Sequence, residues 1–184
     1  MINKVELPNL AADIRQHVGD YEEALPVEDW MPEREGEIDI RIAKDGRWFY
    51  QGVSMERDSV VQLFSTILRK DGDDYFLVTP VEKMKIMVED APFIIRMMDI
   101  EGKGKKQKIH VSSNVGDCFT LSAMHPLTVL YSDGGEPSPY VTVRRNLTAR
   151  ISRPVYYELA ELAVVSESDS ERYGIWSDGQ FYLI

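Results

Sequence analysis

Residues 37–52 read Glu37-Ile-Asp-Ile-Arg-Ile-Ala-Lys-Asp45-Gly46-Arg-Trp48-Phe-Tyr50-Gln-Gly52. Isoleucines at every second position alternate with charged residues, the pattern of a strand with one buried face. Asp45-Gly46 is a hairpin turn signal, because glycine adopts the positive φ that tight hairpins require. Trp48 and Tyr50 continue the alternation on the returning strand. The stretch therefore predicts an antiparallel hairpin.

The segment after this hairpin predicts a helix over 56–69, because its apolar residues recur at spacings of three and four. These residues are Val60, Leu63, Phe64, Ile67 and Leu68. A strand is expected over 75–78. Thr79-Pro80-Val81-Glu82 has the composition of a capping box, which predicts one helical turn before a strand over 85–89.

The flanking regions contain further predicted elements. Residues 93–100 and 107–113 form strand patterns around a lysine-rich loop, and further strands are expected over 127–131 and 140–145. A helix over 152–165 carries Pro154 in its first turn, and Asp178-Gly179 predicts a final hairpin. At the other end, a helix is expected over 9–18. An acidic arm over 20–39 follows, which Trp30 and Met31 are expected to pin to the body.

These elements occur twice in one order: a strand, a turn containing Asp-Gly, a strand, a helix and two more strands. The order predicts an α+β fold of two ββαββ-type repeated units with mainly antiparallel sheet. The expected parts are 1–36 (helix and acidic arm), 37–92 (first unit), 93–126 (bridging strands) and 127–184 (second unit), packed as one body. Arg57 aligns with Arg153 in this arrangement. Chance recurrence of hairpins and helices is the alternative.

Several motifs resemble one family. They are residues 37–52 as quoted above, Arg57…Leu63-Phe64…Leu68-Arg69, Asp73-Asp-Tyr75-Phe-Leu-Val-Thr79-Pro80-Val-Glu82-Lys83 and Val88-Glu89-Asp90-Ala91-Pro92-Phe93. Together they are similar to the uncharacterised bacterial family called "domain of unknown function 1285", from about residue 26 onward. The resemblance implies an α+β fold with repeated motifs and a suggested role in ligand sensing or signal transduction. It supplies no catalytic residues.

Composition limits the classes of function. The chain has 184 residues, with 21 Lys and Arg against 31 Asp and Glu, a formal net charge of −10. Such a charge disfavours nonspecific nucleic-acid binding, because it repels the phosphate backbone. Cys118 is the one cysteine in the sequence, so no intrachain disulfide forms. With no signal peptide or long apolar run in the sequence, we expect a soluble, cytoplasmic protein without membrane contact.

The arginines suggest a site for a small anion. Arg57 and Arg153 fall in the first turns of the two predicted helices, with Arg150 just upstream of the second. Helix N-termini and guanidinium groups both favour anions. We expect this site at the junction of the units, with Trp48 and Tyr50 as walls. The alternative is that the arginines pair with the acidic arm and the aromatic residues belong to the core.

Other chemistry has weaker support. The three histidines are far apart, so no metal site is predicted, and no cofactor motif is found. Cys118 is expected to be a small core residue. The main expectation is a non-enzymatic ligand-binding or signal-transduction protein. One alternative is a hydrolase or transferase with Glu89 or Asp90 as general base. Another is a protein–protein interaction module, with a protein partner or a homodimer.

Overall fold

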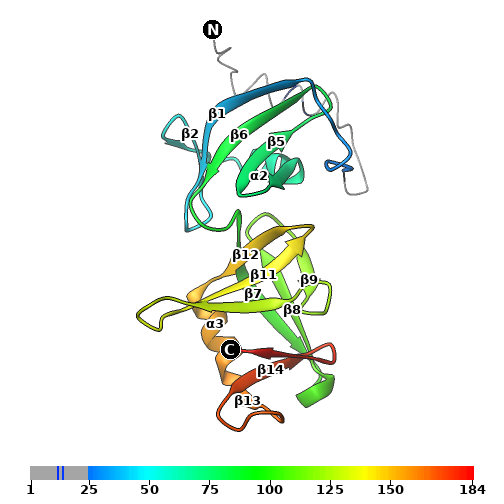
Figure 1. Cartoon of the computed structure of the whole chain (residues 1–184), viewed down its shortest axis with the longest axis vertical. Helices are drawn as coiled ribbons and strands as arrows, with labels where there is room; N and C mark the ends of the chain where they lie inside the picture. The colour runs from blue at the N-terminus through cyan, green and yellow to red at the C-terminus, as the bar shows by residue number, and fades with distance from the viewer. Residues whose placement is uncertain (1–11, 13, 15–24) are drawn as a thin grey trace. The chain divides into compact units, whose positions relative to one another are not determined.

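The protein is described here by a computed structural model, which covers Ala12, Ile14 and residues 25–184. Most of the helix expected over 9–18, and the start of the acidic arm, lie outside the described residues. The chain divides into two compact units, Met1–Asp90 and Ala91–Ile184. Each unit contains a six-stranded sheet and a helix (Figure 1). The α+β class is confirmed, with strand predominating.

The first unit joins two three-stranded antiparallel meanders into one sheet, in the order β3-β2-β1-β6-β5-β4. At its centre β1 and β6 pair in parallel, and they lie side by side in Figure 1. The elements are β1 (Arg34–Ile42), β2 (Trp48–Tyr50), β3 (Val53–Ser54), α2 (Asp58–Thr66), β4 (Leu68–Asp71), β5 (Asp74–Val78) and β6 (Glu82–Val88).

The core of the first unit follows the predicted alternation. Ile38, Ile40 and Ile42 are buried, as the period of two requires. Phe64 of α2 is fully buried and its ring lies 6.4 Å from that of Trp48, centroid to centroid. These contacts fix α2 on the sheet.

Two local predictions in this unit are wrong. The helix ends at Thr66 rather than near 69, because Leu68 begins β4 and pairs with Leu77 of β5. No helical turn forms at Thr79–Glu82. Instead, Thr79 Oγ1 accepts hydrogen bonds from the backbone N–H of Val81 at 3.3 Å and of Glu82 at 3.1 Å, and Glu82 starts β6. Sheet pairing outweighs local helix signals at both places.

The acidic arm is pinned differently from the expectation. Met31 is 84% exposed, so it does not anchor the arm. Val27 is fully buried instead. The buried guanidinium of Arg69 donates hydrogen bonds to the carbonyl oxygens of Val27 at 3.1 Å and Trp30 at 2.9 Å. An arginine of β4 therefore holds the described part of the arm.

Asp71 completes this cluster, and its ion pairs predict that the unit loses stability in acid. It pairs with Arg69 at 2.9 Å and with Lys83 at 3.0 Å. Partial burial raises the pKa of Asp71, but hydrogen bonds from Lys83 and Arg69 outweigh it, so the pKa lies below its usual 3.8. A carboxylate with a lowered pKa stabilises the folded state above the unfolded pKa, and this stability is lost as pH falls through the folded pKa.

We therefore expect Asp71→Asn to destabilise the protein at about pH 7 and to have a progressively smaller effect as pH falls through the lowered pKa of Asp71. Urea unfolding midpoints of wild type and variant at each pH measure this. Asp73→Asn, an exposed aspartate in the same hairpin, is the control. An Asp71→Asn deficit that stays constant from about pH 7 down through the acid range would contradict the ion-pair explanation.

The second unit repeats the sheet plan of the first. Its order is β10-β11-β12-β7-β8-β9, again two antiparallel meanders joined by a central parallel pair, here β12 and β7. The strands of this sheet are β7 (Phe93–Glu101), β8 (Lys108–Ser113), β9 (Cys118–Thr120), β10 (Leu127–Tyr131), β11 (Pro137–Arg144) and β12 (Leu147–Ile151), with a short 3₁₀ turn at Gly104–Lys106.

The expected ββαββ repeat is not confirmed. The six-stranded arrangement is what the two units share, and the helix occupies a different place in each. In the first unit α2 lies between the two meanders, whereas α3 (Arg153–Glu161) follows the second meander. Arg57 and Arg153 therefore do not occupy equivalent positions. Strands β7–β9, in the stretch expected to bridge the units, form half of the second sheet.

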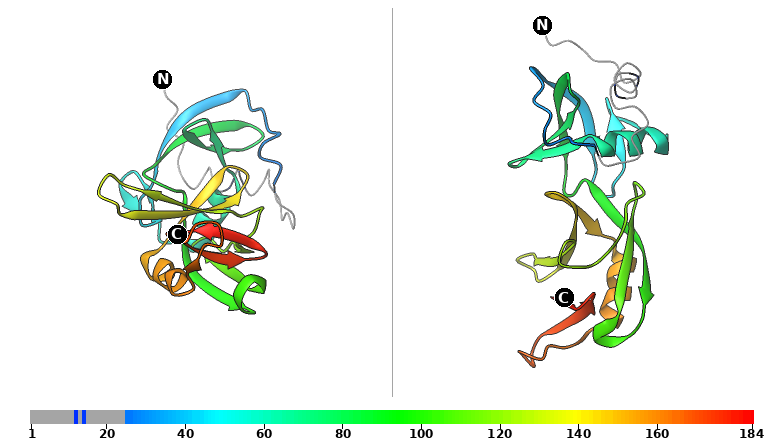
Figure 2. Two further views of the ribbon diagram at one scale, coloured as in Figure 1. Left: turned by 60° about the horizontal axis from the view of Figure 1, so that its bottom comes forward. Right: turned by 90° about the vertical axis from the view of Figure 1, so that its right-hand side faces the viewer.

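A small sheet completes the second unit. It contains β13 (Val164–Val165), β14 (Tyr173–Ser177) and β15 (Gln180–Leu183). Helix α3 buries Val155 and Leu159 and contacts β7 and β14 (Figure 2). The buried hydroxyl of Ser177 donates to the carbonyl of Leu121 at 2.6 Å and accepts the N–H of Ile109 at 3.0 Å, which fastens β14 to β8.

Candidate functional site

A groove opens in the first unit where the parallel pair is irregular. Glu37 pairs with Lys85 and Arg41 with Met87, so the three residues between Glu37 and Arg41 face a single residue of β6. Extra residues on one strand bend it and are left unpaired in the ladder. The groove has a volume of about 610 Å³. Residues 37–40, 73–75 and 85–88 line it.

The lining of the groove contains buried apolar residues and an acidic rim. Ile38, Ile40, Tyr75 and Ile86 belong to the lining but are buried, so their side chains present little surface to the groove. The rim adds four carboxylates and one ammonium, a formal charge of −3. Its charged residues are Glu37, Asp39, Asp73, Asp74 and Lys85. Pockets of roughly 300–1,000 Å³ with apolar walls and a few polar groups suit small molecules.

The surroundings of Lys85 show that the carboxylates of this rim create a negative electrostatic potential. Its Nζ lies 2.9 Å from Oδ1 of Asp74. The hydrogen bond to Asp74 and the nearby charge of Glu37 raise the pKa of Lys85. The groove therefore stabilises a positive charge at its edge.

The arginines of the predicted anion site are divided between the units. Arg57 is the exposed N-cap residue of α2, and Arg153 is the exposed first residue of α3. Arg150 is half-buried on β12, opposite Tyr140. The structure thus places Arg150 near the start of α3 and leaves Arg57 in the other unit. Anion binding by these residues stays a prediction.

The two aromatic residues predicted as walls of the anion site differ in burial. Trp48 is 1% exposed and packs on Phe64, so it belongs to the core and cannot form the wall of an open site. Tyr50 is half-buried on the same strand. None of the predicted site residues lines the groove.

The two carboxyl groups considered for catalysis are poorly suited to it. Glu89 accepts a hydrogen bond from the backbone N–H of Lys44 at 3.0 Å and is ion-paired with Arg41. The bond from Lys44, aided by Arg41, lowers the pKa of Glu89, whereas a general base works best with a pKa near the operating pH. Asp90 also has an interaction partner.

Cys118 is exposed, so the prediction of a core residue is wrong. It lies on the edge strand β9, with its Sγ 3.3 Å from Oγ of Ser112. Within the described part of the chain, no group of three His, Cys, Asp or Glu residues is arranged to hold a metal ion. Nor does any helix in that part have the length and apolarity to cross a membrane.

The lysine-rich loop has local partners. Lys105 pairs with Glu167 at 2.5 Å and lies 5.1 Å from the ring centroid of Trp176. These contacts give Lys105 a structural role beside the small sheet.

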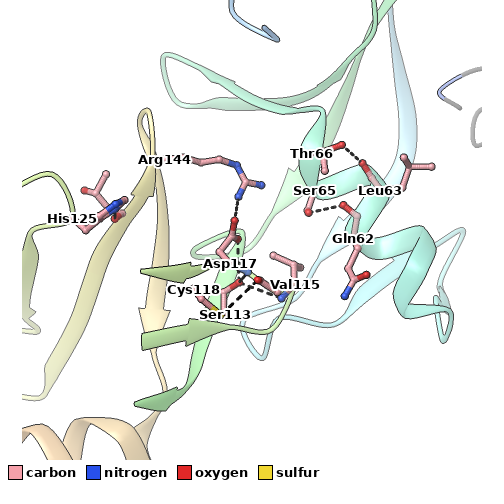
Figure 3. Close-up of polar contacts among 12 residues, drawn as sticks. Gln62, Leu63, Ser65, Thr66, Ser113, Val115, Asp117, Cys118, His125 and Arg144 are labelled. Carbon is pink, nitrogen blue, oxygen red and sulfur yellow. Dashed lines mark hydrogen bonds and ion pairs between the residues drawn. The ribbon is translucent and has the colours of Figure 1, made fainter. Parts of the chain in front are cut away.

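A polar cluster holds the loop between β8 and β9 in place. The sequence did not predict this cluster. The carboxylate of Asp117 accepts a hydrogen bond from the Ser113 hydroxyl at 3.1 Å and pairs with Arg144 of β11 (Figure 3). The Arg144 guanidinium also lies 4.8 Å from the ring centroid of Phe93. Burial lowers the pKa of Arg144, and the charge of Asp117 opposes that shift. With its groups paired to each other, the cluster is structural.

The residues of the groove gave only a weak signal in the sequence. Glu37 and Asp39 read as the solvent face of a strand, and Asp73-Asp74 only as residues before the strand expected over 75–78. They come together only because β1 pairs with β6, and β6 with β5. Local periodicity in the sequence predicts neither this strand order nor the irregular pairing of β1 with β6.

Comparison with known proteins places the chain in a family. Residues 25–91 match the model described as "Domain of unknown function (DUF1285), N-terminal domain". Residues 92–184 match "Protein of unknown function (DUF1285), C-terminal domain". The chain belongs to the DUF1285 family. The two matched domains correspond closely to the two units of the fold.

Solved DUF1285 structures are similar to this chain. The crystal structure of a DUF1285 family protein from Silicibacter pomeroyi DSS-3 is 38% identical, with a TM-score of 0.88, and the match covers 97% of this chain and 94% of that one. Another, from Shewanella baltica OS155, is 31% identical with a TM-score of 0.51, and the match covers 66% of this chain and 90% of that one. A search of curated proteins gave no match.

Proposed function

We propose that this DUF1285 protein is a non-enzymatic ligand-binding protein with a regulatory role, and that the groove of the first unit is its ligand site. The observation that carries this proposal is the opening of about 610 Å³ beside the irregular pairing of β1 with β6. Its volume lies in the usual range of small-molecule sites, and charged groups line it.

The lining suits binding better than bond cleavage. It contains no cysteine, serine, threonine or histidine, so hydroxyl and thiol nucleophiles of Ser, Thr and Cys and the imidazole proton carrier are missing from it. Its acidic rim would repel the small anion expected from the sequence. Binding of an anion by Arg57, Arg150 or Arg153 is a separate proposal, outside this groove.

The role of the groove in ligand binding can be tested by a substitution that fills it, made at an exposed lining residue. Met87 lines the groove and is 61% exposed, so Met87→Trp adds bulk without disturbing the core. Small-molecule binding to the full chain is screened by NMR, using amides of residues 37–40, 73–75 and 85–88 as reporters. We expect compounds that shift these amides to bind Met87→Trp at least about tenfold more weakly, because burial of the ligand is lost.

Met31→Trp is the matched control, since Met31 is 84% exposed and lies outside the lining. It should bind the same compounds with unchanged affinity. Equal affinity of Met87→Trp and wild type for every compound, or a chemically diverse library that leaves these amides unshifted, would refute the groove as the ligand site.

A further inference from the structure

We propose that Thr120 is a site of covalent modification, whose hydroxyl takes an acyl group from a small activated ester. This inference goes beyond the proposed function and does not involve the groove. It follows from a chain of hydrogen bonds on the second unit, which joins the hydroxyl of Thr120, the imidazole of His110 and the carboxylate of Glu101.

The three side chains come from three neighbouring strands. Strand β8 lies between β7 and β9, and His110 of β8 is directly opposite Thr120 of β9. The adjacent residues Ile109 and Leu121 are fully buried, so the alternation of a strand places His110 and Thr120 on the outer face. Glu101 is the last residue of β7, and its side chain is 72% exposed, against 39% for His110. A dissolved reagent can therefore reach this cluster.

The carboxylate of Glu101 fixes the position of the imidazole proton. Nε2 of His110 lies 3.3 Å from Oε2 of Glu101, and Nδ1 lies 2.8 Å from Oγ1 of Thr120. Because a carboxylate only accepts hydrogen bonds, the neutral imidazole carries its proton on Nε2. Nδ1 is then the acceptor, and the Thr120 hydroxyl donates to it. A nucleophile, its general base and a group that positions the base are arranged in this way.

The edge position of β9 supplies a donor for the carbonyl oxygen of the ester. The carbonyl of Asp117 and the N–H of Leu121 both bond to residues of β8. The alternation of an antiparallel ladder therefore turns the N–H of Thr120 toward the free edge of the sheet. A backbone N–H beside the nucleophile can donate to the oxygen on which negative charge develops during acyl transfer.

The modification forms one bond and breaks one. Oγ1 of Thr120 attacks the carbonyl carbon of the ester, and the hydroxyl proton passes to Nδ1 of His110. The bond from the carbonyl carbon to the leaving oxygen then breaks, and the imidazolium returns the proton to the leaving group or to water. The products are O-acylated Thr120 and the free alcohol or phenol. Glu101 is a positioning residue, which orients the imidazole and stabilises its transient positive charge.

The experiment treats the full chain carrying Cys118→Ala with p-nitrophenyl acetate. This background removes the exposed thiol on the same strand. Peptide mapping by mass spectrometry gives the rate of acetylation at each residue, and hydroxylamine removes acetyl esters but leaves acetylated lysines. We expect Thr120 to be acetylated at least about 100-fold faster than Thr128, an exposed threonine on β10 of the same unit.

Variants assign this rate to the imidazole and to its orientation. His110→Gln should lower the rate at Thr120 at least about 100-fold, because it removes the general base. Glu101→Gln should lower it at least about tenfold, because an amide can donate to Nε2 and favour the tautomer with its proton on Nδ1. Nitrogen NMR of the His110 ring should show the Nε2–H tautomer in the parent chain and its loss in Glu101→Gln. Glu136→Gln, at an exposed acid before β11, is the control and should change neither measurement.

Three results would overturn the proposal. The first is acetylation of Thr120 no faster than that of Thr128. The second is an unchanged rate at Thr120 in His110→Gln. The third is an imidazole whose proton lies on Nδ1 in the parent chain, because Nδ1 could then not accept the proton of Thr120. The comparison of Thr120 with Thr128 is made within one molecule, so it does not depend on how well any variant folds.

Discussion

Phe64→Ala is expected to lower the free energy of unfolding of the first unit by about 3–5 kcal/mol. Phe64 is fully buried on α2, and its ring packs against Trp48. Truncation removes the transfer free energy of the ring and leaves a cavity that the flanking strands can only partly fill. The loss is a large fraction of the total stability of a small unit.

The effect is measured by hydrogen exchange in the full chain, because exchange resolves the two units separately. Amides of β1 and β6 should lose protection in Phe64→Ala. Val53→Ala, a truncation at a 70% exposed position on β3, should stay within about 0.5 kcal/mol of wild type. A Phe64→Ala loss below about 1 kcal/mol would show that α2 is not part of the core.

Gly174→Ala is expected to destabilise the second unit by about 3 kcal/mol, near the upper end of the range for overpacking. A Cβ at Gly174 would lie 2.5 Å from Cζ of Phe181 and in steric overlap with the backbone carbonyl of Tyr182. The ring of Phe181 is held in turn by Trp176, 5.1 Å away between centroids. The carbonyl cannot rotate away, so β14 and β15 must separate locally.

Gly134→Ala is the matched control, because its Cβ would meet nothing closer than the Ser132 hydroxyl at 3.8 Å. It should change stability by less than about 0.5 kcal/mol. Exchange at amides of β14 and β15, with the fluorescence of Trp176, reports the loss. If Gly174→Ala is as stable as Gly134→Ala, Phe181 is not packed over Gly174 in solution.

The sequence predicted the first hairpin well because one face of β1 is buried throughout. Ile38, Ile40 and Ile42 had to alternate with polar residues, and Gly46 adopts a φ of 81° in the turn. The pattern was informative because a single energetic demand, burial of one face, acts at every second residue.

Helix lengths and ends were harder to predict. Leu68 continues the apolar helical pattern of α2, yet it belongs to β4, where it pairs with Leu77. Cys118 resembled a core residue because it precedes Phe119 in a strand pattern, yet it lies exposed on an edge strand. In both cases the deciding neighbour lies on another strand, so local spacing carries no information about it.

The same reason explains why the groove was missed. Its residues come from three separate stretches of the chain, and its existence depends on where β1 and β6 stop matching. The arginines were conspicuous in sequence because they fall at helix starts. Their position at α2 and α3 was predictable, but the helices occupy different places in their units.

The central parallel pairs have a consequence for the order of folding. Each meander consists of neighbouring hairpins and can form from local contacts. The pairs that join the meanders are distant: Arg34 and Glu82 are 48 positions apart, and Phe93 and Ala149 are 56 apart. Closing such loops costs entropy before any pairing energy is gained, so these pairs should form last and limit the folding rate of each unit. Until then the inner strands have unpaired edges, which makes newly synthesised chains most prone to aggregation at this stage.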